Sequence, residues 1–480
     1  MDVEQTINPG IKDPLLPNVT KGKRYDSGGV MKNIFVRLKP VETEGNISSL
    51  QVKILFSPES ETLFSFHTRV VDKLFPEFLS SVQLYDEKGP LLFCTETKED
   101  AMLATQTYKA KRLPEGKTWL DYAVKLCAAG KNPVFDMGFE KGGMTGSGMA
   151  LFPEFLAGDY QYSLKWDLGA LPAGSSADWT FGEEARGDGT LLQQTFYAAG
   201  NLHTIRNGNF AFSFLGEEVD FEPLASWSGA LFREMAAFFH DKNNPYHIFA
   251  RNTDCERCGG TALTRSYLFL YQKEYIQTDL DNVKTLFAHE MVHNWPQICD
   301  EPFGTGTWYT EGCAEYFSLL LPWKLGLYTD SRAAEILNQR AADYYENPCI
   351  AYANLALGGD FLSNKEATRV PYGRGMFYLM RVEDVLNEKT GGNVHVEDIV
   401  RDLTEKNKSG SLCTNEDWLF ALKQKCDLDW EKDFASMLSG KVQTPAVGMF
   451  GGRIVFEKQR SVQRQTGEPC DTYYFYEAEG

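Results

Sequence analysis

The chain has 480 residues, of which 43% are hydrophobic and 13% aromatic, which is enough apolar material for two or three folded domains. Its formal charge of −18 at pH 7, with no run of basic residues, excludes the clustered lysines and arginines that bind a nucleic-acid backbone. No apolar run approaches the roughly 20 residues that cross a bilayer, so neither nucleic acid nor a membrane is expected as a partner.

The amino-terminal stretch MDVEQTINPGIKDPLLPN lacks the basic segment followed by an apolar segment that a secretory signal has. The ten cysteines are scattered along the chain without the density of a disulfide-bonded scaffold. We therefore expect a cytoplasmic protein with reduced thiols. The sequence leaves its oligomeric state open.

The first 200 or so residues have the patterns of β-strands. NIFVRLKPVE (33–42) and SLQVKILFS (49–57) mix β-branched and apolar residues in short runs, and YQYSLKWDLGAL (160–171) alternates polar and apolar residues. Stretches rich in glycine and proline separate these runs, as turns separate strands. The patterns predict a β-rich N-terminal domain over residues 1–205.

The hydrophobic period becomes helical from about Ser226. Residues 226–241 predict a helix, 243–251 a turn into a strand, and SYLFLYQKEYI (266–276) another strand. Beyond Gly326 the helix-like segments 331–347, 373–392 and 415–426 dominate, and the last forty residues are β-like. We expect an α+β multidomain protein, with a second domain over 206–325 and a mainly helical C-terminal lobe over 326–480.

Two histidines stand four residues apart in LFAHEMVHNW (286–295), with a glutamate directly after the first. Residues at this spacing share one face of a helix, with Cβ atoms roughly 5–6 Å apart, so His289 and His293 can bind one metal ion. Glu290 is then placed to reach a water on that ion. Thr278 and Pro296 are suitable residues to begin and end the helix.

A catalytic zinc usually has three protein ligands, so two imidazoles require a partner. The segment TWYTEGCAEYFSLLLP (307–322) offers Glu311 and Glu315, which are again four residues apart and lie in a predicted helix. Either glutamate can be the third ligand on this evidence.

HEMVHNW followed by WYTEGCAEYF resembles the zinc site of the aminopeptidase N and glycyl aminopeptidase families. The resemblance implies a thermolysin-like catalytic domain, one Zn²⁺ per chain and a peptide or protein substrate. It also implies that Glu311 is the third ligand and that Glu290 is the general base. Glu311 follows His293 by eighteen positions, one short of the aminopeptidase N spacing.

VPYGRGMFYLMRVEDVL resembles the V-P-Y-E-K-G segment that opens a helix in aminopeptidase N relatives. The resemblance implies that the Tyr372 hydroxyl stabilises the oxyanion of the reaction. Gly373 and Arg374 stand where the family has glutamate and lysine.

CGGTALTRSY resembles the segment that binds the substrate's backbone and free amino group in these families. Gly259 and Gly260 are retained as predicted substrate-binding residues, but Ala262 replaces the amino-binding glutamate. Three nearby acids are candidates to replace it: Asp254, Glu256 and Glu274. The substitution leaves three alternatives to an aminopeptidase: an endopeptidase, a peptidase-like binding protein without turnover, and an ester or epoxide hydrolase on the same scaffold.

Overall fold

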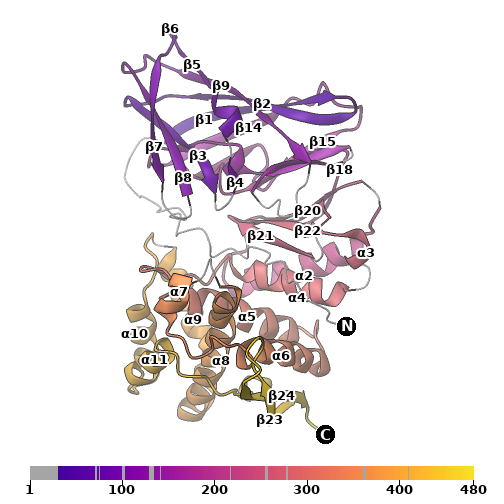
Figure 1. The fold of residues 1–480 in the computed structure, drawn as a ribbon, viewed down its shortest axis with the longest axis vertical. Coiled ribbons are helices and arrows are strands. Elements are labelled where there is room, and N and C mark those ends of the chain that lie inside the picture. The colour runs from indigo at the N-terminus through magenta and orange to yellow at the C-terminus, as the bar shows by residue number, and fades with distance from the viewer. Residues whose placement is uncertain are drawn as a thin grey trace. The chain divides into compact units, whose positions relative to one another are not determined.

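The computed structural model describes residues 31–70, 73–74, 76–99, 103–128, 135–140, 142–216, 218–254, 258–276, 279–360, 364–408 and 410–479. The chain packs as two compact units. Among the described residues, unit 1 lies within Met1–Arg233 and Asp241–Val283, and unit 2 lies within Glu234–His240 and Lys284–Gly480. The prediction of a β-rich N-terminal part and a mainly helical C-terminal part is confirmed (Figure 1), and the boundaries at 205 and 325 stay predictions.

Unit 1 begins with a seven-stranded sheet in the order β16-β14-β1-β2-β9-β5-β6. Its strands are β1 (Lys32–Thr43), β2 (Asn46–Phe56), β5 (Gln83–Asp86), β6 (Gly89–Pro90), β9 (Thr118–Lys125), β14 (Tyr160–Trp166) and β16 (Glu184–Gly187). Along β1 buried and outward-facing residues alternate, because successive side chains of a strand point to opposite faces. The strands predicted over residues 33–42, 49–57 and 160–171 correspond to β1, β2 and β14.

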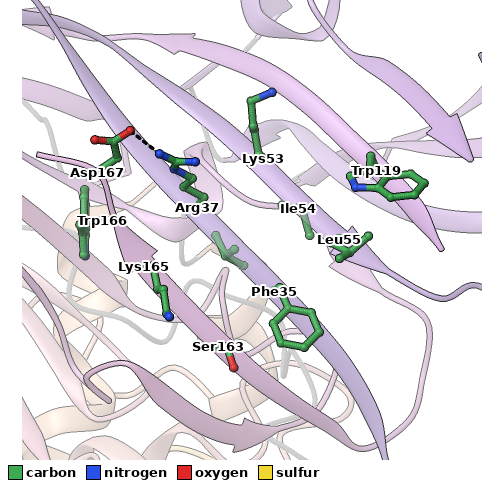
Figure 2. A pocket seen from close by; sticks show the side chains of 11 residues that line it. Phe35, Arg37, Lys53, Ile54, Leu55, Trp119, Ser163, Lys165, Trp166 and Asp167 are labelled. Atoms are coloured by element: carbon green, nitrogen blue, oxygen red, sulfur yellow. Dashed lines mark hydrogen bonds and ion pairs between the residues drawn. The ribbon is translucent and has the colours of Figure 1, made fainter. Parts of the chain in front are cut away.

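The outward face of this sheet carries a shallow groove of about 520 Å³ (Figure 2). Phe35 pairs with Leu55 and Leu55 with Trp119, so the three side chains form a row across neighbouring strands. Beside this row Arg37 donates to Asp167 over 2.8 Å. Phe35 and Trp119 remain 48% and 39% exposed. The outward face of the sheet therefore carries large apolar side chains as well as polar ones.

Two further sheets complete the β-rich part. One has the order β10-β11-β12-β17-β15, and the other has the order β13-β3-β8-β7 with β4 paired to β3. Their strands are β3 (Thr62–Val70), β4 (Lys73–Leu74), β7 (Phe93–Glu99), β8 (Leu103–Ala110), β10 (Cys127–Ala128), β11 (Met137–Glu140), β12 (Gly143–Ser147), β13 (Glu154–Phe155), β15 (Ser176–Trp179) and β17 (Phe196–Gly200). Short helices lie at α1 (Pro76–Leu79) and η1 (Gly148–Ala150).

The last sheet of unit 1 has the order β18-β19-β20-β22-β21. It consists of β18 (Leu202–Asn207), β19 (Phe210–Leu215), β20 (Tyr246–Asn252), β21 (Gly259–Leu263) and β22 (Ser266–Tyr271). Helix α2 (Glu222–Phe238) connects β19 to the parallel strand β20, as a crossover between parallel strands requires. The prediction of one strand over 266–276 is wrong in its second half, because Lys273–Ile276 forms the short helix α3.

Unit 2 is mainly helical. Its helices are α4 (Leu280–Val292, from Lys284 on), α5 (Thr307–Lys324), α6 (Asp330–Tyr345), α7 (Asn354–Asp360), α8 (Lys365–Thr390), α9 (Val396–Asn407), α10 (Asn415–Lys425), α11 (Glu431–Leu438) and η2 (Gly448–Phe450). A hairpin of β23 (Ile454–Val462) and β24 (Pro469–Glu477) follows, as the β-like C-terminal sequence predicts. None of the described helices combines the length and apolar character that a membrane crossing needs.

Helix α8 begins earlier than the sequence resemblance implies. Its N-cap is Asn364, whose side-chain oxygen accepts from the backbone N–H groups of Glu366 and Ala367. Tyr372 therefore lies inside the helix rather than at its start. The helix continues through Pro371, although proline lacks the N–H that would bond to the preceding turn.

Helices α5 and α8 pack backbone against backbone at two glycines. A β-carbon on Gly312 would lie 2.5 Å from the Cα of Gly375. A β-carbon on Gly375 would overlap the carbonyl oxygen of Trp308 on α5. Both positions therefore need glycine. The close approach fixes the distance between α5 and α8, and with it the positions of the side chains that the two helices carry near the crossing.

We expect Gly375→Ala to lower the free energy of unfolding by about 3 kcal/mol, because the added carbon forces the two helices apart. Gly359→Ala on α7 is the matched control, since its added carbon has no heavy atom within 4 Å. It should stabilise the protein by about 0.5–1 kcal/mol. Urea unfolding followed by circular dichroism measures both, and a Gly375→Ala variant as stable as the wild type would contradict the tight crossing.

Candidate metal centre

Helix α4 presents its histidines from a buried position. Phe287, Ala288, Met291 and Val292 have no exposed surface, so the apolar positions of the helix hold it in the core of unit 2. The predicted helix is present from Leu280, and Thr278, its predicted first residue, lies outside the described residues.

His289 lies in the last turn of α4 and His293 in the turn directly after it, and their rings lie close together. Their Nε2 atoms are 3.1 Å apart. The exposed fractions of the two residues are 2% and 6%, and Glu290 between them is fully buried. The four-residue spacing thus brings two imidazole nitrogens together at a place from which bulk water is largely excluded.

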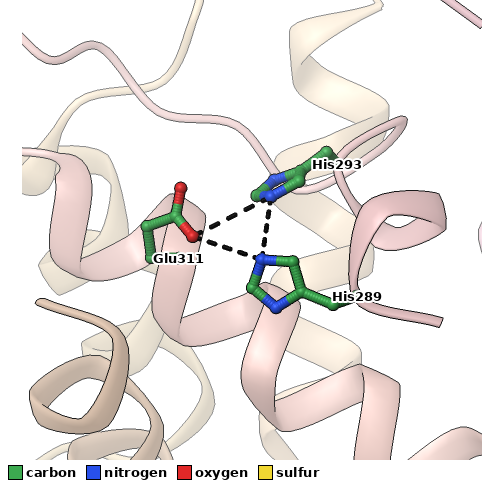
Figure 3. A group of neighbouring side chains, drawn as sticks. All are labelled: His289, His293 and Glu311. Carbon is green, nitrogen blue, oxygen red and sulfur yellow. Dashed lines mark hydrogen bonds and ion pairs between the residues drawn. The ribbon is translucent and has the colours of Figure 1, made fainter. Parts of the chain in front are cut away.

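Glu311 on α5 completes a triangle of donor atoms with the two histidines (Figure 3). Its Oε2 atom lies 3.3 Å from Nε2 of His289 and 3.8 Å from Nε2 of His293. Ligands about 2.0–2.1 Å from a tetrahedral zinc ion are roughly 3.3–3.4 Å from one another. Two imidazoles and a carboxylate at these separations fit a zinc ion in both chemistry and spacing. Within the described part of the chain no other group of three such residues comes this close.

Glu315 meets the opposite edge of the His289 ring. Its Oε1 atom lies 2.9 Å from Nδ1 of His289, whereas Glu311 faces Nε2. The two glutamates that the sequence left as alternatives therefore occupy different places. Glu311 lies in the donor triangle and Glu315 lies behind one of its histidines.

Arg340 on α6 holds Glu315 in this position. Its Nε pairs with the Glu315 carboxylate, and its Nη1 donates to the Glu315 carbonyl oxygen over 2.6 Å. Its Nη2 donates to Ser318 Oγ over 2.9 Å. Burial lowers the pKa of Arg340 from its usual range, and the charge of Glu315 opposes that shift. Arg340 was not predicted as a site residue; the signal for it in the sequence is an arginine among the apolar positions of the 331–347 helix, which indicates a buried acid nearby.

Tyr372 on α8 stacks on the His289 ring, with the ring centroids 5.8 Å apart and the planes inclined by 9°. Burial raises the pKa of Tyr372 well above its usual value, and the negative charges of Glu311, Glu290 and Glu315 raise it further. The phenol therefore keeps its proton and can donate a hydrogen bond. The structure places the Tyr372 ring beside His289, and its role at the oxyanion stays a prediction.

Gly259 and Gly260 belong to unit 1, whereas the donor triangle belongs to unit 2, so their predicted role in substrate binding stays a prediction. They open β21, which is paired only with β22 among the described strands. Gly260 has a φ of +155°, and a β-carbon there would overlap the Leu268 carbonyl oxygen, so the position requires glycine. Ala262 is buried opposite Tyr267.

Of the three acids proposed to replace the amino-binding glutamate, the two that the structure describes are not buried. Asp254 and Glu274 are exposed. Glu256 lies outside the described residues. An exposed carboxylate is well hydrated and contributes little to holding an ammonium group.

The fold is similar to those of known zinc peptidase structures. An aminopeptidase N family protein from Idiomarina loihiensis matches with a TM-score of 0.68 at 13% identity, over 89% of this chain and 79% of that chain. An M1 zinc metallopeptidase from Deinococcus radiodurans bound to a Tyr-Ser-Ala substrate gives 0.52 at 14% identity, over 88% and 96%. Yeast LTA4 hydrolase gives 0.51 at 12% identity, over 85% and 67%.

No protein-family profile matches the sequence, and no curated protein matches it. The likeness is thus one of three-dimensional structure at low identity. It spans nearly the whole chain and includes structures of aminopeptidase N and M1 metallopeptidase type. The resemblance read from the sequence motifs is confirmed at this level: the chain has the fold of the M1 zinc metallopeptidases.

Proposed function

We propose that this protein is a zinc-dependent metallopeptidase in which His289, His293 and Glu311 hold one zinc ion. The observation that carries the proposal is the buried triangle of donor atoms at 3.1, 3.3 and 3.8 Å, the spacing of ligands around one zinc ion. The fold adds support, because its neighbours include an M1 zinc metallopeptidase with a bound Tyr-Ser-Ala substrate and a yeast LTA4 hydrolase with bestatin.

Zinc bound by these residues would lower the pKa of a water molecule toward about 7 and polarise the scissile carbonyl. Glu290 takes the proton of the attacking water and later gives it to the leaving amine. Its fully buried carboxylate on the turn that carries His289 suits this role, since it is not a member of the donor triangle. Tyr372 donates a hydrogen bond from its phenol to the carbonyl oxygen as negative charge develops there.

Glu315 and Arg340 position the site. A carboxylate at Nδ1 of His289 holds the proton on that nitrogen and leaves Nε2 free for a metal. Arg340 keeps the Glu315 carboxylate in place and compensates its charge in a buried environment. The thermolysin-like catalytic domain over 206–325 and the helical lobe over 326–480 remain proposals that rest on the sequence resemblance.

The mode of substrate recognition depends on Ala262. A buried ammonium group needs a carboxylate to offset its desolvation, and alanine supplies none. We propose an aminopeptidase-like enzyme acting in the cytoplasm on peptides, with an endopeptidase as the alternative that the lack of a carboxylate at position 262 favours. An enzyme of the first kind prefers peptides with a free amino group, whereas one of the second kind also cleaves N-acetylated peptides.

Purified wild-type protein should contain about one zinc per chain by elemental analysis, because one donor triangle is present among the described residues. His293→Ala and Glu311→Ala should lose the metal. Glu315→Gln keeps the shape and should retain zinc with an affinity about tenfold weaker, measured by chelator competition. An empty site in Glu315→Gln together with a full site in Glu311→Ala would reverse the assignment of the two glutamates.

A digest of a peptide library read by mass spectrometry tests the activity. Zinc-loaded wild type should cleave, and Glu290→Gln should keep its zinc while kcat falls by several orders of magnitude. Free and N-acetylated versions of the cleaved peptides then separate the two modes of recognition. Turnover by Glu290→Gln at the wild-type rate would remove Glu290 from the mechanism, and no cleavage by the wild type would leave a peptidase-like binding protein.

Tyr372→Phe removes one hydroxyl and keeps the ring that stacks on His289. We expect kcat to fall roughly 10²–10³-fold with little change in KM, since the lost hydrogen bond forms to the oxyanion rather than to the bound substrate. Steady-state kinetics on one peptide measures both constants. A change confined to KM would make Tyr372 a substrate-binding residue instead.

A further inference from the structure

Arg369 lies on α8 one helical turn before Tyr372. Its guanidinium carbon is 5.9 Å from the centroid of the Tyr372 ring, which is a cation–π distance. The side chain is half-buried. Its positive charge acts on the Tyr372 phenol against the raising effect that burial and the nearby carboxylates have on the pKa. A cation is therefore held beside the proposed oxyanion-binding tyrosine.

Most other arginines in the described part of unit 2 are paired with an acid. The ion pairs are Arg332–Glu335, Arg340–Glu315, Arg381–Asp433, Arg401–Asp398, Arg453–Asp330, Arg460–Asp471 and Arg464–Asp343. Arg374, which is fully buried, donates instead to the Ile350 carbonyl oxygen and the Asn354 side chain.

Arg369 differs from all of these, because among the described residues its guanidinium forms no ion pair or hydrogen bond and its one ring contact is with Tyr372. Arg381 gives the closest comparison, because it lies on the same helix and over the ring of Tyr378 at 5.5 Å. Its guanidinium also donates to Asp433 over 2.6 Å. A half-buried guanidinium has lost part of its hydration. A carboxylate compensates for that loss best, because it offers both a negative charge and two hydrogen-bond acceptors.

We propose that Arg369 binds a carboxylate of the substrate, so that the enzyme acts preferentially on peptides with an acidic group close to the cleaved bond. This inference rests on the proposed peptidase function and names the class of substrate. Peptides carry carboxylates in two places, at aspartate or glutamate side chains and at the C-terminus. Both present two oxygens to the planar guanidinium in the same way.

The geometry limits how far that carboxylate lies from the reaction. The Tyr372 ring is 5.8 Å from the His289 ring and 5.9 Å from the Arg369 guanidinium carbon. Two such steps correspond to about three or four residues of an extended peptide, at roughly 3.3 Å per residue. The acidic group therefore belongs to an end of a short peptide or to a side chain within a few residues of the cleaved bond.

The test compares matched peptides on zinc-loaded protein, by calorimetric binding and by steady-state kinetics. One series consists of short alanine peptides ending in a free carboxylate or an amide. The other consists of amidated peptides in which glutamate or glutamine occupies each position in turn. Wild type should bind the acidic member of the relevant pair about tenfold more tightly, with the difference in KM rather than kcat. The series that shows the difference identifies the source of the carboxylate.

Arg369→Ala should bind both members of each pair equally and with the affinity of the neutral peptide. Arg369→Glu should reverse the preference, so that lysine peptides bind more tightly than glutamate peptides. Arg381→Ala is the matched control, since it removes a cation from a tyrosine on the same helix and should leave the acidic preference unchanged.

Equal binding of acidic and neutral peptides by the wild type would overturn the inference, as would a preference that survives in Arg369→Ala. Cleavage without a preference for acidic peptides would support the peptidase function and contradict the role of Arg369. Acidic preference in binding without any cleavage would support the Arg369 site and remove the proposed catalysis. Failure of every peptide to bind would remove both.

Discussion

The close approach of α5 and α8 at Gly312 and Gly375 is the constraint on which the candidate site depends. A β-carbon at either position would meet the backbone of the other helix, so the two helices pack at a distance that other residues do not permit. Glu311 directly precedes one glycine and Tyr372 lies one turn before the other. The crossing therefore brings a carboxylate from α5 and a phenol from α8 to the histidines of α4. A bulkier residue at the crossing would move both groups away from His289.

The charges of the site follow from how deeply it is buried. Glu290, Glu311 and Glu315 lie within unit 2 with little or no exposed surface, which is costly for carboxylates unless cations compensate them. Arg340 compensates Glu315, and a divalent metal ion is the cation that suits the position between Glu311 and the histidines. The same need for charge compensation applies to Arg369, because its positive charge forms no ion pair with an acid among the described residues.

The departures from the aminopeptidase N pattern at Gly373 and Arg374 have structural explanations. A β-carbon on Gly373 would overlap the Tyr344 side chain of α6, so α6 packs close to α8 at this point. Arg374 is fully buried and donates to the Ile350 carbonyl oxygen over 2.6 Å, which ties α8 to the segment before α7. The two residues adapt α8 to its neighbours and leave the tyrosine beside His289.

Features that depend on local periodicity can be predicted from the sequence alone. Short runs of β-branched and apolar residues predict β1 and β2, and alternation predicts β14. The four-residue spacing brings the rings of His289 and His293 together at the end of α4, because a helix imposes that period on neighbouring residues. The start of α8 is not evident from the resemblance, which opens the helix at Val-Pro-Tyr, whereas Asn364 caps it further upstream. Only the tertiary structure separated Glu311 from Glu315. Both are buried and four residues apart on α5, and which nitrogen of His289 each one meets depends on how α4, α5 and α6 pack. The role of Arg340 likewise depends on Glu315, which lies on another helix, and that of Arg369 depends on the absence of an ion-pair partner among the described residues. The spacing of residues in the sequence does not show which side chains of different helices meet.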